Sequence, residues 1–147
     1  MKITVCWSAS FRGEKIEIRD QLIELWHVPL LDEWTEKIFK WEAPELEKQV
    51  KQESSEVKKK FDFIKMYYDF IVESDAVLIC NFSKKSIKNY IWSNTFLEIG
   101  YAHVYWKKIF LLNPIPEKQE YILDELKAMD PIVLNWDLSL IKKICFT

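Results

Sequence analysis

The segments DAVLICN at 75–81, NTFLEIGYAHVYW at 94–106 and KKIFLL at 107–112 decide the fold class of this chain. The first and the last contain continuous apolar runs, which are typical of strands buried on both faces of a parallel sheet. The segment between them has the apolar periodicity of an amphipathic helix. A strand, a helix and a second strand in this order predict a βαβ unit with parallel strands.

The same alternation continues on both sides of this unit. Further strands are expected at 2–7, 28–31 and 131–136, and further helices at 14–27 and 119–129. Residues 32–41 show no clear pattern, whereas Pro44 suits the first turn of a long helix over 45–73. The sequence therefore predicts an α/β fold. We expect a three-layer, flavodoxin-like (Rossmann-like) domain with about five parallel strands in the order 2-1-3-4-5.

Composition and charge fit a single globular domain over 1–147. The chain is 49% hydrophobic and has a formal net charge of −2. At this length about 70% of the unfolded surface is buried on folding. No basic face indicates nucleic acid as a partner, and no apolar run is long enough to cross a membrane. The start is too short for a signal peptide, so we expect a cytoplasmic protein that binds neither nucleic acid nor membrane.

Cysteine and glycine usage adds two expectations. The three cysteines lack the spacing of metal ligands, and Cys6 and Cys80 lie in apolar runs. We expect them to be small core residues in a reducing compartment, with no metal and no cofactor bound. The only two glycines, Gly13 and Gly100, are each expected at a place that tolerates no side chain.

Glu98 is the most conspicuous polar residue, since it lies between Leu97 and Ile99 near the start of the predicted 94–106 helix. Two interpretations stay open. If Thr95 caps the helix, Thr95 and Glu98 form a capping box, in which the glutamate bonds back to the cap amide. If Asn94 caps it, the box does not close. In either case Glu98 lies near the start of the helix and faces the carboxyl ends of the strands, where ligands bind in such sheets.

Other candidate binding residues follow the first and third predicted strands. Backbone amides in the first loop can hold a phosphate, and an arginine can add charge-assisted hydrogen bonds. A plain loop with a solvated arginine is the alternative there, and a strand-end cap is the alternative for the asparagine that ends the third strand. The candidates are Ser8, Ser10, Arg12, Gly13, Asn81 and Asn94.

Three of these segments resemble the nucleoside 2-deoxyribosyltransferase superfamily, which includes the deoxynucleoside 5′-monophosphate N-hydrolases. They are DAVLICN at 75–81, NTFLEIGYA at 94–102 and KKIFLL at 107–112, and SFRGE at 10–14 is similar to the first loop of the N-hydrolases. The resemblance covers most of the domain apart from 32–60. It implies a nucleoside- or nucleotide-like small molecule as the ligand and a homo-oligomer as the assembly.

The resemblance also implies a mechanism. Glu98 matches the family's nucleophile, which attacks C1′ of the deoxyribose before water or a second base takes the sugar. The sequence departs from the family pattern in two places. Trp92 lies where an aspartate or a glycine-rich turn is usual. Counting back eight positions from Asp75, where the N-hydrolases carry a second carboxylate, gives Tyr67.

Three functions follow from this pattern. The first is cleavage of a nucleoside or nucleotide N-glycosidic bond, or deoxyribosyl transfer, through Glu98. The second is a catalytically incomplete module that binds or senses a nucleotide. The third is a TIR-like signalling domain, because such domains also combine a parallel sheet with a helical glutamate near a nucleotide cleft. The strand at 75–81 is compatible with all three functions.

Overall fold

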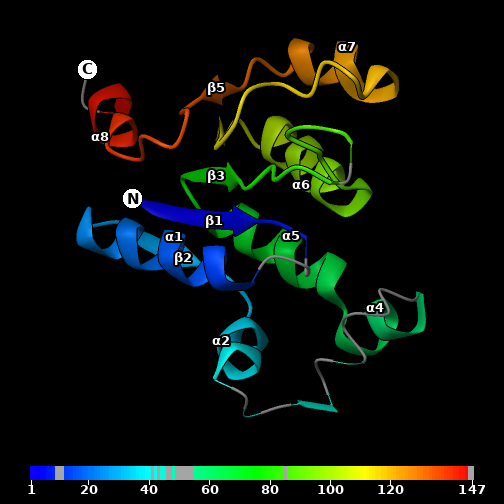
Figure 1. The fold of residues 1–147 in the computed structure, drawn as a ribbon. Coiled ribbons are helices and arrows are strands. Elements are labelled where there is room, and N and C mark those ends of the chain that lie inside the picture. Colours follow the sequence, from blue (N-terminus) through cyan, green and yellow to red (C-terminus); the bar gives the residue numbers. More distant parts are fainter. Residues whose placement is uncertain are drawn as a thin grey trace.

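The computed structural model describes residues 1–8, 12–40, 42, 44–45, 48, 55–84 and 86–145. In these residues five parallel strands form one sheet in the order β2-β1-β3-β4-β5 (Figure 1). The strands are β1 (Lys2–Cys6), β2 (Val28–Leu30), β3 (Ala76–Ile79), β4 (Lys108–Leu111) and β5 (Ile132–Val133). The predicted fold class and the predicted strand order are confirmed.

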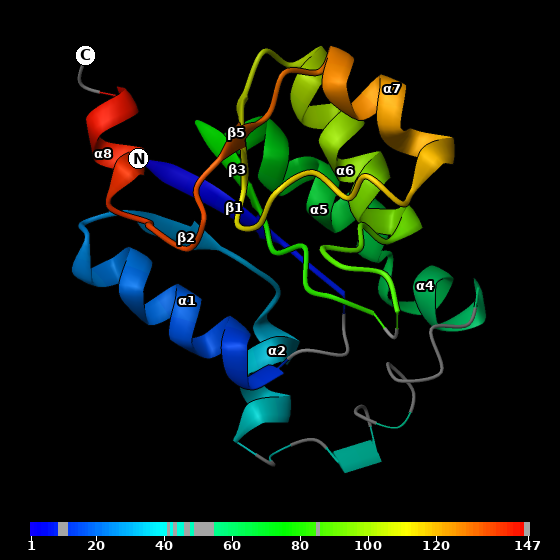
Figure 2. The same cartoon turned by 45° about the horizontal axis from the view of Figure 1, so that its top comes forward.

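Helices cover both faces of the sheet, as Figure 2 shows. One face carries α1 (Arg12–Glu24) and α8 (Leu140–Cys145), and the other carries α5 (Phe63–Glu73), α6 (Ser93–Val104) and α7 (Glu120–Ala128). The shorter helices α2 (Glu33–Phe39) and α4 (Ser55–Phe61) are among the described residues between β2 and α5 in the chain. None of the helices in the described ranges is long and apolar enough to cross a membrane.

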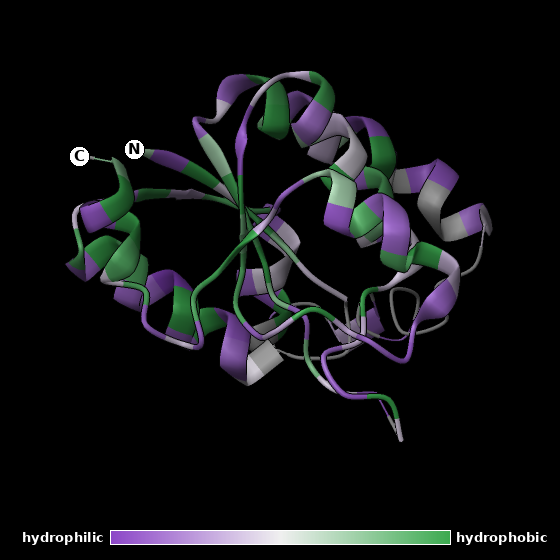
Figure 3. Ribbon diagram, turned by 90° about the horizontal axis from the view of Figure 1, so that it is seen from above, coloured by the Kyte–Doolittle hydropathy of each residue, from purple (hydrophilic) through white to green (hydrophobic). Residues whose placement is uncertain are grey.

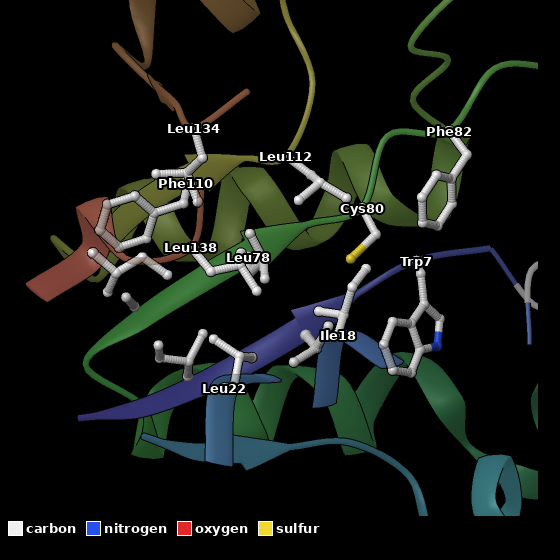
Figure 4. Close-up of a cluster of buried hydrophobic side chains, with 14 residues drawn as sticks. Trp7, Ile18, Leu22, Leu78, Cys80, Phe82, Phe110, Leu112, Leu134 and Leu138 are labelled. Carbon is white, nitrogen blue, oxygen red and sulfur yellow. The ribbon is translucent and has the colours of Figure 1, made fainter. Parts of the chain in front are cut away.

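The apolar run of β3 is explained by its two buried faces. Leu78 and Cys80 point into the core under α1 and α8, where Figure 4 shows Leu78 near Ile18 and Leu22. The alternate residues Val77 and Ile79 belong to the second core, under α5, α6 and α7. Because successive side chains of a strand point to opposite faces, both sets must be apolar. Figure 3 shows hydrophobic residues gathered along the central strands.

The strand register places the loops that could bind a ligand on one rim. Cys6 pairs with Ile79, and Ile79 pairs with Leu111, so the carboxyl ends of β1, β3 and β4 are level. Cys6 and Cys80 are buried and their thiols are free, which confirms their predicted place in the core.

The prediction of a single helix over 45–73 is wrong for the residues of this range that the structure describes. Helix α4 ends at Phe61, and Asp62 adopts a left-handed conformation with φ of 47°. The Asp62 carboxylate then accepts a hydrogen bond from the Lys65 backbone N–H at 3.4 Å and caps α5. Much of 45–60 lies outside the described residues. The described side chains of Glu45, Lys48, Ser55, Glu56, Lys59 and Lys60 are exposed, as expected.

The expectation for the two glycines is also wrong. Neither Gly13 nor Gly100 has a positive φ, and a Cβ added at either would meet no atom within 4 Å. Gly100 therefore does not bring α6 closer to the sheet. It lies in a shallow apolar groove on the outer side of α6 and α7, next to Leu97 and Val104.

Replacing Gly100 with alanine is expected to stabilise the protein. Glycine inside a helix costs about 0.5–1 kcal/mol relative to alanine, and the open space around Gly100 accepts a methyl group without a clash. Urea denaturation of G100A should therefore show a higher midpoint with an unchanged slope. A lower midpoint would mean that the backbone at Gly100 is packed more closely than this structure has it.

Candidate functional site

The structure excludes the capping box at Glu98. Helix α6 begins at Ser93, its N-cap is Trp92, and no side chain makes the cap hydrogen bond. Thr95 is therefore the third helical residue and not a cap, and Glu98 lies one turn further into the helix. A glutamate at this position is not needed to begin the helix, so its burial needs another explanation.

Glu98 is a buried carboxyl group with one unsatisfied oxygen. Its residue is 7% exposed, and Oε2 has no hydrogen-bond partner among the described residues. Burial raises its pKa from the ordinary value of 4.5 to about 8, although hydrogen bonds from Cys6 and Asn94 act in the opposite direction and lower the pKa. The negative charge of Asp32 raises the pKa further and the positive charge of Lys15 lowers it. Glu98 is therefore mainly protonated at neutral pH, unlike an ordinary glutamate.

Four other segments bring titratable groups to Glu98: Cys6 from the end of β1, Lys15 from α1, Asp32 from the loop after β2, and Tyr67 from α5. Burial raises the pKa of the Cys6 thiol well above its ordinary value, and Glu98 adds to the effect. Burial also raises the pKa of Tyr67, with further contributions from Asp32 and Glu98. Both groups therefore stay neutral, as does the protonated Glu98, and the charges of the described cluster reside on Asp32 and Lys15.

Asp32 is a second carboxylate near Glu98 that was not among the residues predicted for the site. The Thr35 backbone N–H donates to Asp32 Oδ1 at 2.9 Å, and the Thr35 hydroxyl donates to Oδ2 at 2.9 Å. The Tyr67 hydroxyl also donates to Oδ2, at 2.8 Å. Asp32 thus caps α2 and at the same time joins α2 to α5. Tyr67, which lies eight positions before Asp75, is in this way hydrogen-bonded to a carboxylate from another element.

Lys15 is a second residue that sequence reasoning missed. It is 2% exposed, and its Nζ lies 4.7 Å from the centre of the Trp7 ring, close enough for a cation–π contact. The signal for its burial was in the sequence. Lys15, Ile18 and Leu22 are spaced by three and four residues, which places them on one face of α1, and the two apolar members are buried.

The residues predicted in the first loop are only partly described. Ser8 is 2% exposed and follows the end of β1, on the same rim as Glu98. Ser10 lies outside the described residues, and of Arg12 only the backbone, which begins α1, is described. Gly13 is exposed in the first turn of α1. The phosphate-binding role of this loop stays a prediction.

Of the two predicted asparagines, Asn94 reaches Glu98 and Asn81 is bonded elsewhere. The Asn94 side chain hydrogen-bonds to Glu98 from one turn earlier in α6. Asn81 Nδ2 donates to the carbonyls of Asn113 and Pro114 at 3.0 and 3.1 Å, and its Oδ1 accepts from the Asn113 backbone N–H at 2.9 Å. These bonds tie the loop after β3 to the loop after β4, so the Asn81 side chain has a structural role.

Trp92 lies in an aromatic cluster at the start of α6. Lys84 Nζ is 3.9 Å from the centre of the Trp92 ring and 4.9 Å from that of Tyr90. The Tyr90 and Trp92 rings meet edge to face with centres 5.3 Å apart. Trp92 Nε1 is buried and finds no hydrogen-bond partner in the part of the chain that the structure describes.

Comparisons with family models, with curated proteins and with solved structures find no match. The described residues also contain no group of three or more histidine, cysteine, aspartate or glutamate side chains that could hold a metal ion.

Proposed function

We propose that this protein cleaves the N-glycosidic bond of a nucleoside or nucleotide, or transfers its deoxyribosyl group, with Glu98 as the nucleophile. The observation that carries the proposal is the buried Glu98 carboxyl group on the rim formed by the strand ends, whose Oε2 has no hydrogen-bond partner among the described residues. In parallel sheets this rim is where ligands bind. The resemblance of EIGYA at 98–102 to the family's nucleophile motif supports the same role.

The chemistry requires Glu98 in its ionised form. An oxygen of the carboxylate attacks C1′ of the sugar, the C1′–N bond breaks, and the base leaves with the bonding electrons and takes up a proton. Water or a second base then attacks C1′ and releases Glu98. The transition state of each step resembles an oxocarbenium ion, which a neighbouring negative charge stabilises. Because the pKa of Glu98 is about 8, we expect the rate to rise with pH through that value.

A panel of nucleosides, nucleotides and nicotinamide dinucleotide tests this proposal directly. The protein is incubated with each compound, and released base is measured by chromatography, with and without a second base as acceptor. We expect base release from at least one deoxynucleoside or deoxynucleotide. Release of nicotinamide alone would favour the TIR-like function instead. A panel in which nothing is released, at pH 7 and at pH 9, would contradict the proposal.

Binding without turnover is the second candidate function, and the Asp32 hydrogen bonds favour it. Both oxygens of this carboxylate already accept protein hydrogen bonds, and the Tyr67 proton is directed at Asp32. Neither group therefore has a proton aimed at a departing base. A thermal-shift screen with the same panel separates the two functions, because a binding module is stabilised by a nucleotide that it leaves intact.

A further inference from the structure

In the part of the chain that the structure describes, the charges around Glu98 are balanced only while Glu98 is protonated. Among the described groups that face it, Asp32 contributes one negative charge and Lys15 one positive charge. Both residues are buried, at 8% and 2% exposed. Cys6 and Tyr67 are neutral, because burial raises the pKa of both groups, and Asn94 carries no charge. An ionised Glu98 would therefore be a second negative charge beside a single described positive one.

Asp32 cannot easily move away from this arrangement. Its carboxylate is fixed by two hydrogen bonds from Thr35 and one from Tyr67, all within 2.9 Å. Tyr67 is itself 7% exposed and packs in the core under α5, with its ring edge-on to Phe70. A buried charge held by three hydrogen bonds acts on its neighbours through a medium of low polarity, where electrostatic effects are stronger than in water.

The second observation is the Glu98 oxygen itself. Oε2 is buried and no described group hydrogen-bonds to it, whereas every oxygen of the Asp32 side chain is satisfied. Buried polar atoms in native proteins nearly always have a partner, so an atom without one indicates a ligand or a functional role. The missing partner must suit a carboxyl group that lies close to a second, fixed carboxylate.

We propose that the Glu98 site receives a singly charged cationic ring, that Asp32 supplies the second carboxylate for it, and that Glu98 releases its proton when the cation binds. The proton passes from the Glu98 carboxyl group to the solvent, and the cation restores the charge balance beside Asp32 and Lys15. The inference rests on the proposed function for the class of ligand. A sugar ring with oxocarbenium character carries such a charge, and a hydroxylated pyrrolidine is its stable mimic.

Calorimetry with two matched rings tests the inference. A hydroxylated pyrrolidine is a monocation at pH 7, and the tetrahydrofuran with the same substituents is neutral. Each is titrated into the protein in two buffers of different ionisation enthalpy, which gives the number of protons released. We expect the pyrrolidine to bind at least about tenfold more tightly and to release close to one proton, because a group with a pKa of about 8 is roughly nine-tenths protonated at pH 7.

Three variants identify the source of the effect. D32N keeps the shape and the helix cap, since asparagine also suits an N-cap, and should remove most of the preference for the cation. Proton release should persist in D32N, because burial is the main cause of the raised pKa of Glu98. E98Q has no proton to lose and should release none. D69N is the matched control, because Asp69 is an exposed carboxylate of α5 that pairs with Lys65 at 2.7 Å, and it should behave as the wild type.

Equal binding of the two rings, binding of neither, or a preference for the cation that persists in D32N would each overturn the inference. Y67F tests whether an effect of D32N arises from altered packing at the Tyr67–Asp32 hydrogen bond or from the lost charge. It removes the hydroxyl but leaves the Asp32 charge, so the preference for the cation should persist, and its loss would overturn the assignment to charge. The outcome of the base-release panel does not depend on the outcome of this calorimetry. Cation binding without base release refutes the proposed function only, and base release without a preference for the cation refutes this inference only.

Discussion

Glu98→Gln is expected to reduce base release by on the order of a thousandfold or more, with little change in fold. The amide keeps the shape of the side chain but cannot form the glycosyl ester, so the covalent step disappears. Because Glu98 does not cap α6, its replacement should leave the start of the helix intact. The measurement is the initial rate of base release at pH 8.5, where most of the wild-type Glu98 is ionised.

The control for this prediction is Glu24→Gln, the same chemical change at an exposed residue at the end of α1. It should leave the rate unchanged. If E98Q releases base at the wild-type rate while its circular dichroism spectrum is unaltered, Glu98 has no part in the chemistry. The buried carboxyl group would then be a feature of packing or of ligand binding alone.

The second large effect concerns stability at high pH. The pKa of Glu98 rises from 4.5 to about 8 in the folded protein, so between these values the folded state binds more protons than the unfolded state. The contribution of Glu98 to stability is therefore fully present below about pH 4.5 and is lost as pH rises through about 8. Integrated over this window, the loss is on the order of 4–5 kcal/mol.

Comparison with E98Q isolates this contribution, because glutamine does not titrate. The difference in unfolding free energy between the two proteins should shift in favour of E98Q by several kcal/mol between pH 4.5 and pH 9, on the order of 10 °C in Tm. Any fixed cost of the buried amide cancels, since it is present at both pH values. A difference that does not change with pH would mean that Glu98 is solvated and ionised at neutral pH.

The parts of the fold that the sequence could predict are those set by local pattern. The strand at Ala76–Ile79 was predictable because both of its faces are buried, so the segment is apolar throughout. Helix α2 was not, because it is short and its apolar residues do not form a clear periodic stripe. The interruption of the helix at Asp62, between α4 and α5, could not be predicted either. A left-handed aspartate within a run of helix-forming residues leaves no pattern in the sequence.

For the site, the sequence identified Glu98 and Asn94 but not their charged neighbours. Asp32 reaches the cluster through Tyr67, a residue 35 positions away in the chain, and no local pattern links the two. The position eight residues before Asp75, where the resemblance implies a second carboxylate, is Tyr67, and the carboxylate that bonds to it comes from the loop after β2. Tertiary packing alone brings these groups together, which is why the spacing of residues could not reveal the cluster.

Trapping the glycosyl ester is the most direct test of Glu98 as the nucleophile. A 2′-fluoro-2′-deoxyarabinonucleoside slows breakdown of such an ester, because the electron-withdrawing fluorine destabilises the oxocarbenium-like transition state. Intact-mass spectrometry followed by peptide mapping should find one fluorosugar on the peptide that contains Glu98, and none on E98Q. Release of the base with no adduct on the protein, or an adduct on any other residue, would contradict the account.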